Sequence, residues 1–159
     1  MSERNYWLMK SEPDVYGIDH LMNEPDQITH WDGIRNYAAR NYMRDGMKVG
    51  DGVFFYHSMV KVPSIVGTME VVKEAYTDHT QFDPNEKYFD PKSPKSNPRW
   101  IMVDVKFRNK WENPVTRNEL KKHDWHKEMV LFKISRLSVG PITEEQWQLI
   151  HELAGQTPW

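Results

Sequence analysis

Two short segments of the chain place flat aromatic side chains next to hydrogen-bonding and charged groups. Residues 7–13 lead from Trp7 to a lysine, a serine and a glutamate, and residues 31–37 set Trp31 beside a glycine turn. A nucleobase has a flat π-face and a rim of donors and acceptors, so its pocket needs an aromatic plate and short hydrogen-bonding side chains. Trp31 as the plate, with Ser11 or Asn36 at the edge, fits that requirement.

The two tryptophans also have plainer interpretations. Trp7, on a predicted strand, is expected in the core, because large aromatic side chains mostly serve packing. Trp31 lies between His30 and Asp32 in a polar turn, where a fully buried tryptophan is less expected. The pattern therefore leaves a core role and a ligand-stacking role for Trp31 equally open.

Charge along the chain argues against an indiscriminate cationic clamp on nucleic acid. The formal net charge is −2, whereas non-specific binding draws nearly all its energy from phosphate neutralisation. Two basic segments nevertheless stand out, residues 35–48 and residues 92–110. These segments are either solvated surfaces or phosphate contacts, and the candidates for phosphate contact are Arg40, Arg44, Lys92, Lys95 and Arg99.

Several kinds of chemistry are excluded or unsupported. The chain has no cysteine, which removes disulfides, thiolate metal sites, a cysteine nucleophile and the zinc site of nucleobase deaminases. Neither glycine-rich phosphate motif of nucleotide-binding enzymes occurs. His123 and His126 form a pair without a third ligand, and Ser58 with Lys61 matches S-x-x-K without its companion motifs. We predict no metal, no cofactor and no catalytic residue.

The length of 159 residues matches one ordinary domain, and we predict that residues 1–159 form a single one. The aromatic share of 13% predicts an aromatic-rich core. No uninterrupted apolar run exceeds four residues, and the N-terminus lacks a signal-peptide pattern. A cytoplasmic protein without membrane association is expected, and a monomer too, because nothing resembles a coiled-coil seam.

Hydrophobic period and turn residues predict the elements that must position these side chains. The predicted strands cover residues 6–9, 53–57, 65–74, 100–108 and 129–134. The predicted helices cover residues 18–22, 34–44 and 116–122, and a C-terminal helix begins at a capping box of Thr143 and Gln146. This order without regular alternation predicts an α+β domain with a mixed or mostly antiparallel sheet, preferably a small curved β-barrel with short flanking helices.

The segment from Tyr76 to Pro98 is too long for an ordinary connection and contains four prolines. We predict a functional flap rather than a domain linker. Its adjacent aromatic residues, Tyr88 and Phe89, predict that it packs down on the domain.

Five blocks of the sequence, in order from about residue 5 to residue 150, together resemble the EVE domain family. They are YWLMKSEP at residues 6–13, WDGIRNYAARN at 31–41, MKVGD with FFYHS at 47–58, FDP with YFDPKS at 82–93, and SRLSV with a proline at 135–141. Five ordered blocks over nearly the whole chain are far more specific than any single motif.

The resemblance implies a PUA-like, barrel-like fold related to the YTH readers of methylated adenine. It implies binding of nucleic acid that carries a modified cytosine, such as 5-methylcytosine or 5-hydroxymethylcytosine, with the base flipped into a pocket. Trp31 is then the implied aromatic wall. The residues implied to line, flank or rim the pocket are Lys10, Ser11, Arg35, Asn36, Tyr56, His57, Ser58, Ser135, Arg136, Leu137 and Ser138.

Three functional hypotheses follow. The main one is a non-catalytic module that recognises a modified base in DNA or RNA. The first alternative is an enzyme acting on a modified base or a small nucleotide-like molecule, with Glu12, Asp32 or His57 as acid or base. The second is a protein-interaction module that uses the flap as its docking surface. The sequence leaves the polymer, the preferred modification and the pathway open.

Overall fold

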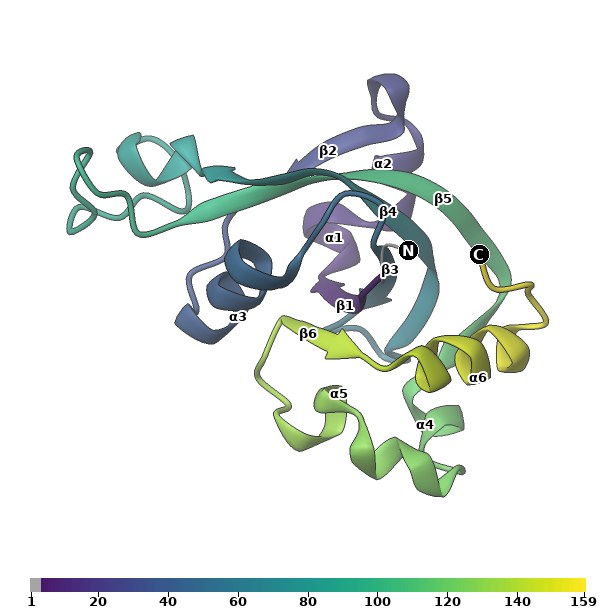
Figure 1. Cartoon of the computed structure of the whole chain (residues 1–159). Coiled ribbons are helices and arrows are strands. Elements are labelled where there is room, and N and C mark those ends of the chain that lie inside the picture. The colour runs from purple at the N-terminus through teal and green to yellow at the C-terminus, as the bar shows by residue number, and fades with distance from the viewer. Residues whose placement is uncertain (1–3) are drawn as a thin grey trace.

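A single six-stranded sheet runs through the computed structural model, which describes residues 4–159 (Figure 1). Strands β1 and β3 pair in parallel, and all other neighbours are antiparallel, which confirms the predicted mostly antiparallel α+β architecture. In the spatial order of the sheet the strands are β2 (Ile28–Trp31), β5 (Ile101–Thr116), β4 (Ser64–Thr77), β3 (Gly52–His57), β1 (Tyr6–Ser11) and β6 (Val139–Ile142).

The sheet is open, and the prediction of a closed barrel was wrong. Its edge strands β2 and β6 have four residues each, and within residues 4–159 they pair with β5 and β1 but not with each other. Pro141 in β6 has no backbone N–H, so it suits an edge position. The long strands β4 and β5 still curve around the molecule and extend together toward the flap (Figure 1). The PUA-like relationship stays a prediction.

Side chains on the central strands alternate between two hydrophobic cores. Val53 and Phe55 of β3 belong to one core, whereas Phe54 and Tyr56 belong to the other. This alternation follows from the two-residue period of a strand. A strand buried on both faces contains a continuous apolar run, and β3 has one.

Short helical segments cover both faces of the sheet. None of them, within residues 4–159, is long and apolar enough to cross a membrane. Their bounds are α1 (Pro13–Tyr16), α2 (Ile18–Met22), η1 (Pro25–Gln27), α3 (Tyr37–Asn41), the π-helical turn η2 (Tyr42–Gly46), η3 (His79–Phe82), α4 (Arg117–Leu120), η4 (Asp124–Glu128), α5 (Val130–Lys133) and α6 (Glu144–Ala154).

Most helix predictions are confirmed, and capping residues explain where the helices begin. Thr143 accepts from the backbone N–H of Gln146 in the capping box that starts α6. The helix predicted from residue 34 begins only at Tyr37, because Asn36 is extended and its side chain caps α3. Helices α2 and α4 lie where they were predicted.

The strand predicted over residues 129–134 was wrong, because this segment contains α5. A run of four apolar residues has no period that separates a strand from a buried helical turn. The last strand is β6. It was not predicted, because it contains Gly140 and Pro141 and both residue types disfavour strand interiors. Strand β2 was not predicted, since its four residues are too few to show alternation.

Candidate functional site

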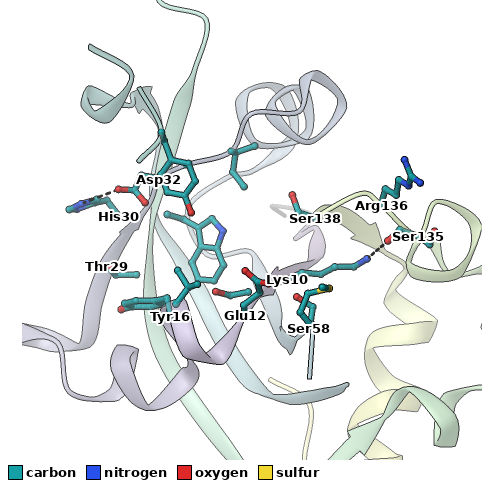
Figure 2. Close-up of a pocket in the computed structure, with 17 residues that line it drawn as sticks. Lys10, Glu12, Tyr16, Thr29, His30, Asp32, Ser58, Ser135, Arg136 and Ser138 are labelled. Carbon is teal, nitrogen blue, oxygen red and sulfur yellow. Dashed lines mark hydrogen bonds and ion pairs between the residues drawn. The ribbon is translucent and has the colours of Figure 1, made fainter. Parts of the chain in front are cut away.

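A cavity of about 760 Å³ lies where the sheet stays open, between the region of β2 and the segment that leads into β6 (Figure 2). Five parts of the chain line it: the end of β1 with α1, strand β2 with its following turn, the β3–β4 loop, the flap, and residues 135–138. Binding sites for small molecules usually measure about 300–1,000 Å³. The cavity is therefore large enough for a ligand of nucleoside size.

Trp31 forms part of the cavity wall and is also part of the core. Only 7% of the residue is exposed, and its ring stands edge-on to Phe55 at 5.4 Å and to Tyr16 at 6.2 Å between centroids. These contacts hold the indole in one orientation. The two roles that the sequence left open for Trp31 are thus compatible in one place.

The ring of Tyr88, which belongs to the flap, packs against the turn that follows Trp31. Gly33 has φ of +78°, and a Cβ atom built there would lie 2.5 Å from Cε2 of Tyr88. Its backbone N–H also donates to Asp78 at 2.9 Å. Two features therefore require a glycine at this position: the left-handed backbone and the close approach of the Tyr88 ring.

Replacing Gly33 with alanine is expected to lower the free energy of unfolding by about 1–3 kcal/mol, from overpacking and backbone strain. Urea denaturation measures the change. Gly50→Ala is the matched control, because Gly50 has φ of +96° with no atom within 4 Å of the added Cβ. Equal losses in the two variants would mean that the contact between Gly33 and Tyr88 contributes nothing.

Arg35 does not line the cavity itself but flanks it, and it holds the flap in place. Its guanidinium donates to the Asp78 carboxylate at 3.0 Å, to the Tyr88 carbonyl at 2.7 and 3.0 Å, and to the Thr80 hydroxyl at 3.1 Å. Burial alone would raise the pKa of Asp78, but hydrogen bonds from Thr80, Gly33 and Arg35 outweigh burial and lower it.

A buried glutamine holds the flap together internally. The Gln81 amide donates to the carbonyls of Asp78 and Trp100 at 2.6 and 2.8 Å. Its oxygen accepts from the Ser93 hydroxyl at 2.6 Å and from the Trp100 N–H at 3.1 Å. These bonds tie the start of the flap to its end. The flap packs on the domain through Tyr88, whose ring lies against Gly33 and whose carbonyl accepts from Arg35, whereas Phe89 is 38% exposed. The predicted packing is therefore confirmed for Tyr88 only.

On the side of the cavity opposite Trp31, Lys10 connects the end of β1 to residues 135–138. Its ammonium donates to the Ser135 carbonyl at 2.8 Å (Figure 2). Burial lowers the pKa of Lys10, and the positive charge of Arg117 adds to that effect. Ser58 and Ser138 lie nearby and offer hydroxyl groups to the cavity.

Two carboxylates line the cavity, with Asp32 across from Lys10 and Glu12 beside it (Figure 2). Asp32 is half-buried, and among residues 4–159 the only basic side chain within 4.0 Å of its carboxylate is that of His30, at 3.9 Å between Nε2 and Oδ2 (Figure 2). Burial and the charge of Asp78 raise the pKa of Asp32. Glu12 also lines the cavity. The cavity thus offers carboxylate acceptors, serine hydroxyls and the Lys10 ammonium.

Seven of the predicted pocket residues line this cavity, and five do not. The seven are Lys10, Ser11, Trp31, Ser58, Ser135, Arg136 and Ser138. Besides Arg35, the other four residues have roles in the structure outside the cavity wall. Asn36 caps α3, Tyr56 points to the opposite core by strand alternation, Leu137 is buried, and His57 accepts from the Ile18 N–H at 3.1 Å. Burial lowers the pKa of His57.

Sequence reasoning missed several wall residues. Tyr16, Thr29 and Met59 line the cavity although no motif marked them for binding. The Tyr16 hydroxyl is buried, and burial raises its pKa. Only the aromatic character of Tyr16, close to the first block, offered a signal.

The residues predicted to contact phosphate all lie outside the cavity, and that role stays a prediction. Arg40 packs over the Tyr37 ring at 4.6 Å and donates to the Arg99 carbonyl at 3.1 Å. Arg44 pairs with the exposed Asp45 at 2.8 Å. Lys92 and Lys95 are exposed on the flap.

Comparison with known proteins gives a family match over most of the chain. The model of the EVE domain matches residues 5–153. Rat thymocyte nuclear protein 1 is 46% identical, over 97% of this chain and 75% of the relative. The human protein of the same name is 44% identical, over 97% of this chain and 76% of the relative.

Solved structures resemble the whole fold. A hypothetical protein from Leishmania major is 45% identical with a TM-score of 0.91, over 96% of each chain. The human THYN1 protein in complex with 5-methylcytosine-containing DNA is 44% identical with a TM-score of 0.90, over 97% of this chain and 99% of that one.

Proposed function

The chain belongs to the EVE domain family, and from that premise we propose that it binds DNA carrying a modified cytosine such as 5-methylcytosine. The similar human THYN1 protein was solved with 5-methylcytosine-containing DNA. The observation that carries the proposal is the cavity of about 760 Å³ with Trp31 in its wall. No catalytic step is required for this function.

The proposed ligand is a base that has left the stack. A base inside a duplex cannot reach a cavity of this kind, so it must be flipped out of the helix. Inside the cavity the base stacks on Trp31, and stacking on an aromatic side chain contributes about 1–3 kcal/mol. Tyr16 and Tyr88 supply further aromatic wall.

The polar groups of the cavity suit a cytosine edge. Carboxylates accept hydrogen bonds from the exocyclic amino group of cytosine, and Asp32 and Glu12 provide them. The hydroxyls of Ser58 and Ser138 can donate or accept. Arg136, exposed beside the cavity, is placed to meet the DNA backbone.

Discrimination by the methyl group alone is expected to be modest. Burying one group of CH₂ size contributes about 0.8 kcal/mol, which is roughly a fourfold preference. A hydroxymethyl group that gains a hydrogen bond in the cavity would be preferred more strongly.

A titration followed by fluorescence anisotropy tests the proposal. The labelled oligonucleotides differ at one base only, which is cytosine, 5-methylcytosine, 5-hydroxymethylcytosine or N6-methyladenine, in single-stranded and duplex DNA and in RNA at fixed low salt. We expect tighter binding to a modified cytosine in DNA by about fourfold or more.

Equal affinity for every oligonucleotide would contradict base recognition. Turnover of a modified nucleoside would favour the enzyme instead, and absence of any nucleic-acid binding would favour a protein-interaction module.

A further inference from the structure

The β3–β4 loop presents an unusual apolar side chain beside the cavity. Met59 is 81% exposed, and it lines the cavity together with Val15, which is 51% exposed on α1. Val62 in the same loop is 55% exposed. Single exposed apolar residues are common on proteins, but these three gather around one cavity and its adjoining loop.

The backbone of the loop holds Met59 in this exposed position. Met59 has φ of +55°, a left-handed conformation that is uncommon outside glycine. The start of the loop is fixed by a hydrogen bond from the Ser58 N–H to the Ser11 carbonyl at 3.0 Å. Its end is fixed by a bond from the Arg117 N–H to the Pro63 carbonyl at 2.8 Å. The loop is thus anchored at both ends.

We propose that Met59 is a wedge that enters the base stack of duplex DNA and fills the gap left by the extruded base. The inference rests on the proposed function. Proteins that distort DNA insert apolar side chains, methionine among them, between base steps. Methionine is unbranched and flexible, so it can adapt to a gap of irregular shape.

Charge around the loop favours DNA as the occupant. Lys61 is exposed two residues after Met59, and the exposed Arg136 lines the same cavity. A base entering the cavity is still attached to its backbone, so the phosphates on either side of it must pass the rim. Cations at the rim can contact those phosphates while Met59 occupies the stack.

The test compares Met59→Ala with the original chain on three DNAs that carry one 5-methylcytosine. These are a fully paired duplex, the same duplex with an abasic site opposite the modified base, and the single strand. We expect Met59→Ala to weaken binding to the paired duplex about tenfold, because extrusion then leaves an empty gap. Binding to the single strand should change less than about twofold, because no stack is opened there.

Two further variants sharpen the comparison. Met59→Leu keeps an apolar side chain of similar size and should retain duplex binding. Val49→Ala removes a different exposed valine, 57% exposed and outside the cavity lining, and should have no effect on any arm.

The proposal is overturned if Met59→Ala binds the paired duplex as tightly as the original chain, or if it loses equal affinity for duplex and single strand. Failure of the proposed function gives a different result. The unmethylated version of each of the three DNAs, titrated alongside, would then bind the original chain as tightly as the methylated one, and both proposals would fall.

Discussion

Replacing Asp78 with alanine is expected to lower the free energy of unfolding by about 3–5 kcal/mol, because breaking a buried ion pair leaves the other charge unpaired. The Asp78 side chain has no exposed surface, and Arg35, its partner at 3.0 Å, is 21% exposed. Asp78 also accepts from the Gly33 N–H and from Thr80. Urea or thermal denaturation measures the loss.

Asp45→Ala is the control for this prediction. Asp45 pairs with Arg44 at 2.8 Å, but both side chains are largely exposed. Exposed pairs contribute about 0–1 kcal/mol, so this variant should remain nearly as stable as the original chain. A loss as small for Asp78→Ala as for Asp45→Ala would show that the flap does not depend on the buried pair.

The Asp78 carboxylate also makes the free energy of unfolding depend on pH. The pKa of Asp78 is lower in the folded chain than its ordinary value of about 3.9. Its ionised form therefore stabilises the fold fully above the unfolded pKa, and this contribution is lost as the pH falls through the folded pKa. Denaturation at several pH values should show a constant difference between the original chain and Asp78→Asn above about pH 5, shrinking below about pH 4.

Replacing Trp31 with leucine is expected to weaken binding of the preferred modified oligonucleotide by about 5- to 150-fold. This range corresponds to about 1–3 kcal/mol of base stacking. Leucine keeps the position apolar and limits the cavity left in the core, where Trp31 contacts Phe55 and Tyr16. Anisotropy titration measures affinity, and circular dichroism verifies that the variant is folded.

Trp111→Leu separates binding from stability. Trp111 is 2% exposed in the core on the other face of the sheet, where it stands edge-on to Phe54. Its replacement should destabilise the fold but leave DNA affinity unchanged. If the two variants lost equal affinity, Trp31 would have only a structural role.

Several features of this protein were determined by local sequence. The capping box at Thr143 predicted the start of α6, and the apolar run at residues 53–56 predicted β3. Both signals depend on residues that are neighbours along the chain. The ordered sequence blocks placed Trp31 with Lys10 and Ser11, which lie around one cavity in the folded chain.

Other features were decided only by the tertiary structure. Arg35 could be assigned to a pocket or a surface until its partner Asp78, 43 residues away, was known. Tyr88 became a cavity wall because the flap returns to Gly33. The open edge of the sheet depends on which distant strands pair. Short strands such as β2 and β6 have too few residues for the sequence to predict that pairing. Local patterns set the conformation of a segment, whereas contacts between distant segments set the site, since they depend on packing of the whole chain.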